Sequence, residues 1–209
     1  NLDNLIAGFA FNAGSGSYET LYDKNYHHRL EGSYTEFFKI PIKDHTLEIG
    51  FQGGFIPNKV DSFFNFFGGG LTGLKGYSFY SLEGNKLALL NATYRFPIWR
   101  HIDSKLAQLY LDKVFGGIYF GGGDAWSKDA DFKRSIGGEV RMEFYSFFVY
   151  PTRVTFNAAY GLDKFTTRGP IMYKMNATND GVITGNQLVK NGKEWRYYLT
   201  ILFGFTLFD

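Results

Sequence analysis

An apolar residue at every second position of segment 195–208 constrains the fold of this chain more than any other feature. The apolar positions of that alternation are Leu199, Ile201, Phe203, Phe205 and Leu207. A period of two places such residues on one face of a β-strand. The segment also reaches the length of about 9–11 residues with which a tilted strand crosses a bilayer. It therefore predicts a strand with one continuously apolar face.

The same alternation recurs along the chain and predicts eight strands. We expect them at residues 2–13, 26–40, 46–56, 86–98, 108–121, 134–148, 152–163 and 195–208. In segment 86–98, for example, Ala92 and Tyr94 alternate with Thr93 and Arg95, so each strand has one apolar and one polar face. The polar-face side chains that we expect to meet one another are Glu48, Thr93, Arg95, Glu139, Arg141 and Glu143.

The connections between these strands alternate in length. Segments 42–45, 99–105 and 149–151 are short, whereas segments 14–25, 57–85, 122–133 and 164–194 are long and rich in Gly, Asn, Asp and Lys. Short periplasmic turns and long external loops are typical of bacterial outer-membrane barrels. The pattern therefore predicts a transmembrane, antiparallel, up-and-down β-barrel in the outer membrane of a Gram-negative bacterium. An even number of strands then puts both termini in the periplasm.

The composition agrees with such a barrel. Aromatic residues make up 20% of the 209 residues, yet the mean hydropathy is only −0.20, and no apolar run reaches the roughly 18 residues of a membrane helix. A barrel produces this combination because half of each strand faces lipid and half faces the lumen. A net charge of +2 does not indicate a nucleic-acid partner, and we expect none. We expect one domain over 1–209; a soluble sandwich or barrel is the alternative.

Several segments together resemble the outer-membrane assembly superfamily, that is, the BamA-type or bacterial surface antigen proteins. Segment 57–85 is rich in Phe and Gly and contains the motif Leu74-Lys75-Gly76-Tyr77. The following strand carries Tyr94-Arg95-Phe96-Pro97, and segments 116–126 and 157–162 are similar to later strands of that family. The closing strand resembles the sorting signal of outer-membrane proteins through Gly204, Phe205, Leu207 and Phe208.

The resemblance implies a loop held inside the barrel, with three altered residues. In the family, the Arg of the loop motif reaches acidic side chains on the inner wall. Here Lys75 takes that position, while Thr93 and Gly121 take the usual acidic positions of the wall. Only guanidinium offers a planar fork for two hydrogen bonds to a carboxylate. We therefore expect a modified contact, in which Lys75 pairs with Glu139, Glu143 or Glu48.

The number of strands also differs from the family, whose barrels have sixteen strands after periplasmic repeat domains; we expect no such domains in 1–209. The interior of an eight-stranded barrel is just wide enough for side chains, so the 29 residues of segment 57–85 do not fit inside it. We favour a closed eight-stranded barrel with the loop over its outer mouth, alone or as a homodimer. The alternative is half of a sixteen-stranded barrel completed by another copy.

The expected role is outer-membrane biogenesis, protein insertion or transport, with lipid bilayer, lipopolysaccharide and client outer-membrane proteins as partners. The alternative is a structural or surface-binding barrel that presents segments 57–85 and 164–194 outside the cell. We expect no enzyme, since the chain lacks a G-x-S-x-G elbow and the glycines at 68, 70 and 73 lack a following helix. His27 and His28 face opposite sides of one strand, so we expect no metal and no cofactor.

Overall fold

The computed structural model describes residues 8–19, 24–58, 62–100, 102, 104–106, 109–146, 150–168, 172–175, 181–184 and 188–203. Its long strands are β1 Gly8–Glu19, β2 Lys24–Lys39, β3 Thr46–Phe55, β6 Lys86–Trp99, β8 Leu109–Trp126, β9 Lys133–Ser146, β10 Tyr150–Gly161 and β15 Trp195–Phe203. The short strands are β4 Phe66–Gly68, β5 Leu82–Gly84, β7 Ser104–Leu106, β11 Phe165–Arg168, β12 Met172–Met175, β13 Gly181–Thr184 and β14 Leu188–Asn191. A 3₁₀ turn, η2, covers Ser62–Phe64.

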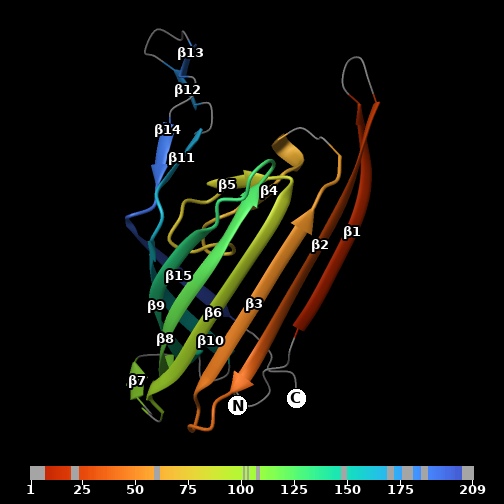
Figure 1. Ribbon diagram of the computed structural model, residues 1–209. Coiled ribbons are helices and arrows are strands. Elements are labelled where there is room, and N and C mark those ends of the chain that lie inside the picture. The colour runs from red at the N-terminus through yellow and green to blue at the C-terminus, as the bar shows by residue number, and fades with distance from the viewer. Residues whose placement is uncertain are drawn as a thin grey trace.

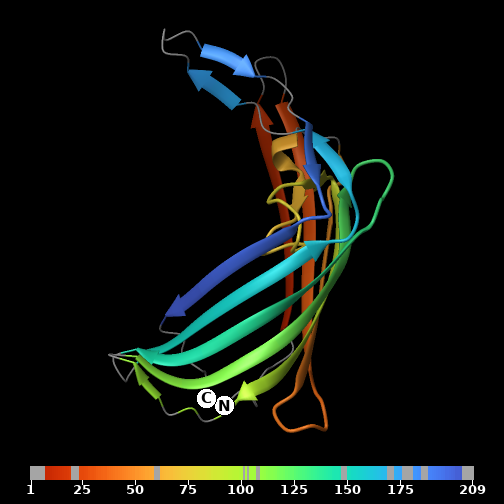
Figure 2. The same ribbon diagram turned by 90° about the vertical axis from the view of Figure 1, so that its left-hand side faces the viewer.

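The long strands form one antiparallel sheet in the order β1-β2-β3-β6-β8-β9-β10-β15, so each long strand pairs with the next one along the chain. The sheet curves strongly, and its strands are tilted with respect to one another (Figures 1 and 2). The prediction of an all-β, antiparallel chain is confirmed. No helix among the described residues is long and apolar enough to cross a membrane.

Most of the expected strand boundaries that the structure describes agree with the sheet. β1 continues beyond the expected end at 13 to Glu19, and β8 continues beyond the expected end at 121 to Trp126. Residues 1–7 and 204–209 lie outside the described residues, and with them the closing-strand residues Gly204, Phe205, Leu207 and Phe208. The sequence-based expectations for these four residues therefore stay predictions.

The sheet has two open edges, β1 and β15. Each of these strands pairs with one neighbour, β2 and β10 respectively, and the described residues form no ladder between β1 and β15. The expected closure into a barrel is therefore not formed by the part of the chain that the structure describes.

Segment 57–85 covers the inner face of the sheet, which we define as the face that carries Leu87, Leu89 and Tyr119. Within this segment β4 pairs with β5, and the hairpin lies beside β6 and β8 (Figure 1). Apolar side chains from the segment and from the sheet form a common buried cluster of Ile56, Phe66, Leu74, Tyr77, Leu82, Leu87, Leu89 and Ala125. Burial of this cluster holds the segment against the sheet.

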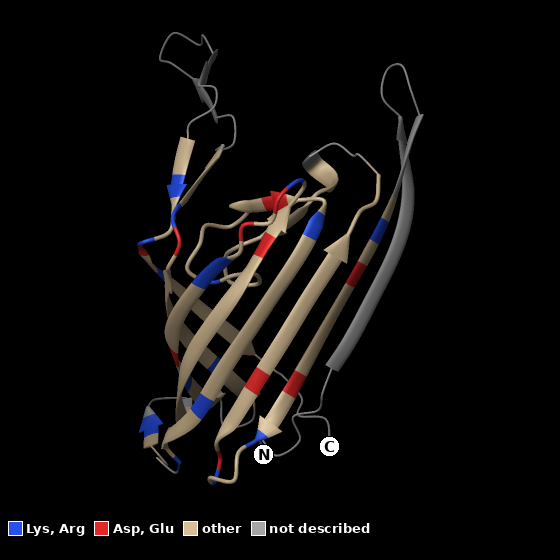
Figure 3. Cartoon of the chain, in the orientation of Figure 1, with Lys and Arg blue, Asp and Glu red and all other residues tan. Residues whose placement is uncertain are grey.

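The opposite, outer face of the sheet is apolar and exposed. Leu90 on β6, Ile118 on β8 and Leu199 on β15 are 46%, 55% and 64% exposed. Phe51, Phe120, Ile136, Val140, Phe156 and Ile201 belong to the same exposed set. Figure 3 shows the charged positions of the long strands, which are separated by stretches of other residues. An exposed apolar surface of this extent marks a face that contacts something other than water.

Candidate functional site

The motif at 74–77 is the most firmly held part of segment 57–85. Leu74 and Tyr77 are fully buried. The backbone N–H of Lys75 donates to the Tyr119 hydroxyl at 3.3 Å, and the N–H of Gly76 donates to the Tyr198 hydroxyl at 3.1 Å. These two tyrosines come from β8 and β15, so the motif is bound to strands far apart in the sheet.

Tyr77 connects the motif to the ends of β9 and β10. Its hydroxyl donates to the carbonyl oxygen of Arg134 at 2.7 Å and accepts from the N–H of Asp163 at 3.0 Å. The Arg134 guanidinium pairs with the Asp163 carboxylate at 2.9 Å. Hydrogen bonds from Arg134 hold the pKa of Asp163 below its usual value. The Tyr77 hydroxyl therefore both donates and accepts a hydrogen bond. The ion pair between Arg134 and Asp163 stabilises the two backbone segments that it binds.

Gly76 allows the motif to approach the sheet backbone. Its φ is +89°, and a Cβ placed there would lie 2.8 Å from the backbone N of Gly161 and 2.9 Å from the carbonyl carbon of Tyr160. An L side chain is strained at this φ whatever the space around it. Glycine at position 76 is thus required by the backbone conformation and by the contact with β10.

The ammonium of Lys75 lies on the inner face between β8 and β10. Its Nζ donates to Asn157 Oδ1 at 3.0 Å and lies 4.7 Å from the centre of the Tyr119 ring, a cation–π contact. The three carboxylates that the sequence suggested as partners form no described ion pair with it. Burial lowers the pKa of Lys75, while the nearby Glu139 carboxylate acts in the opposite direction.

Near Lys75, the inner face carries a network of ion pairs centred on Arg95. Arg95 pairs with Glu48 on β3 through Nη1 and with Glu139 on β9 through Nε. Arg141 approaches the same Glu139 oxygen at 3.5 Å, and Arg153 approaches Glu143 at 3.3 Å. The structure thus brings together, on one face, residues that the sequence selected: Glu48, Arg95, Glu139, Arg141 and Glu143.

Thr93 and Gly121 lie on the same face, and neither offers a charged partner to the motif at 74–77. Thr93 is buried. A Cβ at position 121 would lie 2.1 Å from the Tyr119 hydroxyl and 2.7 Å from Leu74 Cδ1. Gly121 therefore makes room for Leu74 and for the tyrosine that holds Lys75. At this position the wall contacts an apolar side chain instead of offering an acid.

Tyr119, Tyr198 and Asp163 hold the motif although the sequence did not single them out. The alternation places Tyr119 on the same face as Gly117 and Gly121, and small neighbours on a strand are a signal that another segment approaches. Tyr198 lies near the start of β15, and tyrosines near strand ends are also typical of membrane interfaces. No pattern within the chain distinguishes a hydroxyl that faces the loop from one that faces lipid headgroups.

The site also limits the chemistry of this face. Among the described residues, no group of three or more His, Cys, Asp or Glu side chains could hold a metal ion. The fold and site define a class: an antiparallel sheet with an apolar outer face, a charged inner face and a loop bound to that inner face. Comparisons with protein-family models, curated proteins and solved structures found no match for this chain.

Proposed function

We propose that the sheet is part of the wall of a bacterial outer-membrane β-barrel. The observation that carries the proposal is the division between the two faces of the sheet. Leu90, Ile118 and Leu199 are exposed on the outer face, whereas Arg95 and Glu139 are paired on the inner face. A lipid-facing exterior and a polar interior are the pattern of membrane barrels. A protein in water would gain nothing from leaving this apolar face uncovered.

We further propose that segment 57–85 occupies the lumen, held by the motif at 74–77. The hydrogen bonds of Lys75, Gly76 and Tyr77 to four long strands support this role. The resemblance of the motif to the outer-membrane assembly superfamily favours work in outer-membrane biogenesis, protein insertion or transport.

The position of segment 57–85 also favours the larger of the two barrels. An eight-stranded barrel has room only for its own side chains, whereas here the β4–β5 hairpin and a buried cluster lie on the inner face. We propose that β1 and β15 each pair with a strand outside this sheet, because an unpaired strand edge is not tolerated in lipid.

A surface-binding barrel is the second candidate. The β11–β14 ladder and the β12–β13 hairpin extend beyond the end of the sheet at which segment 57–85 lies (Figures 1 and 2). Such an extension on the external side would present a binding surface.

Reconstitution into liposomes tests the membrane proposal and separates the two roles. We expect β-rich circular dichroism and stable folding only with detergent or lipid; a chain that stays folded and monomeric in water contradicts the proposal.

Faster folding of a second outer-membrane protein in the same liposomes supports the assembly role, and Gly76→Ala should remove that gain while Gly122→Ala keeps it. No acceleration, together with ligand binding that requires residues 164–194, supports the surface-binding role.

Cross-linking tests the closure of the sheet. The chain contains no cysteine, so one cysteine introduced in β1 and one in β15 give an unambiguous product. A product with the mass of one chain indicates eight-stranded closure and contradicts the larger barrel. A product with the mass of two chains supports a barrel shared by two copies.

A further inference from the structure

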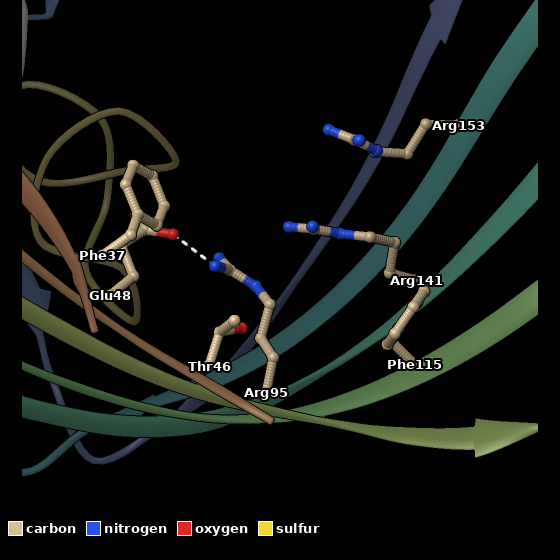
Figure 4. A pocket seen from close by; sticks show the side chains of 7 residues that line it. All are labelled: Phe37, Thr46, Glu48, Arg95, Phe115, Arg141 and Arg153. Atoms are coloured by element: carbon tan, nitrogen blue, oxygen red, sulfur yellow. Dashed lines mark hydrogen bonds and ion pairs between the residues drawn. The ribbon is translucent and has the colours of Figure 1, made fainter. Parts of the chain in front are cut away.

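A small cavity on the inner face is surrounded by three arginine side chains. Its volume is about 140 Å³, and Arg95, Arg141 and Arg153 enter it from β6, β9 and β10. The three guanidinium groups point into the same space (Figure 4). Phe37, Thr46, Glu48 and Phe115 complete the lining.

Arg141 is the least satisfied of the three. Its side chain is 13% exposed, and its Nε is buried without a hydrogen-bond partner. The described carboxylate contact of Arg141, to Glu139 Oε1, is long at 3.5 Å, and that oxygen already accepts from Arg95 Nε at 2.5 Å. Guanidinium has five N–H donors. A buried donor without an acceptor is costly, and an unseen water or ion is a frequent explanation.

Among the described residues that line the cavity, three cations face one carboxylate: Arg95, Arg141 and Arg153 against Glu48. Glu48 lines the cavity but is held by Arg95, as the dashed line in Figure 4 shows. The described lining therefore carries more positive than negative charge, and its one carboxylate is already paired.

We propose that this cavity binds a small oxyanion of the phosphate class, with Arg141 and Arg153 as its main ligands. Guanidinium groups bind phosphate oxygens through paired, charge-assisted hydrogen bonds, which a point charge does not match. The same chemistry fits free phosphate and the phosphate of a lipid headgroup. The site is built from side chains of the sheet, so its occupation does not depend on which role the barrel has.

Titration of the folded full chain in a non-ionic detergent with inorganic phosphate tests the proposal. We expect saturable binding by calorimetry that an equal ionic strength of chloride does not reproduce. Arg141→Gln should weaken binding at least about tenfold, since it removes charge-assisted hydrogen bonds. Arg141→Lys keeps the charge without the fork and should give an intermediate loss.

Arg134→Gln is the matched control, because Arg134 pairs with Asp163 at the far end of β9 and does not line the cavity. It should leave phosphate binding unchanged, and near-ultraviolet circular dichroism verifies that each variant is folded. Competition by glycerol phosphate points to a free ligand, whereas competition only by phosphatidylglycerol in mixed micelles points to a headgroup. Absence of saturable binding to the folded wild-type chain, or equal binding by Arg141→Gln and Arg134→Gln, overturns the proposal.

Discussion

Lys75 Nζ donates a hydrogen bond to Asn157 Oδ1 over 3.0 Å, and these two residues are 82 positions apart in the chain. The contact joins the tip of segment 57–85 to the middle of β10. The contact gives the ammonium of Lys75 a neutral acceptor. A neutral amide accepts from the ammonium while Arg95 keeps the acids Glu48 and Glu139.

Replacing the acceptor should loosen the segment. Asn157→Leu leaves a half-buried ammonium without its hydrogen bond, so we expect a loss of about 1.5–3 kcal/mol in the free energy of unfolding. Asn157→Asp should retain or increase the stability, because the carboxylate restores the acceptor and adds an opposite charge. Thermal unfolding in detergent and limited proteolysis within 57–85 measure the difference. Equal protection of the segment in both variants would contradict the contact.

Gly76→Ala should release the motif from the sheet. The positive φ alone costs about 1–3 kcal/mol for an L residue, and the new Cβ would meet the backbone of Gly161 at 2.8 Å. Gly122→Ala is the control, since its Cβ would have ordinary contact, 3.8 Å from the carbonyl oxygen of Lys133. We expect faster cleavage of segment 57–85 in Gly76→Ala only. Similar cleavage rates in the two variants would show that the approach to β10 is unimportant.

Neighbouring positions on β15 distinguish the two faces. Leu199 lies on the exposed outer face, so Leu199→Arg should cost about 2–4 kcal/mol if that face meets the middle of a bilayer. Thr200 pairs with Thr155 and lies on the inner face, where Thr200→Arg should cost much less. The two variants are compared by their folding yield in liposomes. The yield is measured by gel electrophoresis, in which the folded form changes its mobility on heating. A larger loss for Thr200→Arg would reverse the assignment of the faces.

Acid should weaken the ion pair between Arg134 and Asp163. The Arg134 guanidinium holds the pKa of Asp163 below its usual value, so the folded state favours the ionised carboxylate. This contribution is present above the unfolded-state pKa of about 3.9 and is lost as the pH falls through the lower folded-state value. The effect is small, because Arg134 is largely exposed and screened by solvent. Asp163→Asn should weaken the dependence of the unfolding temperature on pH between about pH 4 and pH 2. If this dependence is the same in the variant and the wild-type chain, the ion pair is not its cause.

Alternation predicted the strands well wherever one face is apolar. β3, β6, β9 and β10 lie within three residues of their expected boundaries, because each carries large apolar side chains at every second position. The expected first strand ended too early, at residue 13, because Gly14–Ser17 has the composition of a loop. Yet β1 continues through it to the pair Glu19↔Lys24, since backbone hydrogen bonds to β2 need no particular side chain.

β8 shows the same limit at its other end. Gly121–Gly123 offers no apolar alternation, but the strand continues to Trp126 because both of its neighbours pair with it there or close by. Gly121 and Gly123 leave room for the Leu74 and Leu89 side chains, respectively, on the inner face. Their role is visible only when segment 57–85 is in place.

The amino-acid sequence by itself determined which side chains share a face, because the period of two depends only on neighbouring residues along one strand. It therefore placed Glu48, Arg95 and Glu139 on one surface before any contact was known. Only the tertiary structure decided that Lys75 meets Asn157 and that Tyr119 and Tyr198 hold the motif. Those contacts depend on strand register, sheet curvature and the path of a long loop, which arise from many distant residues acting together.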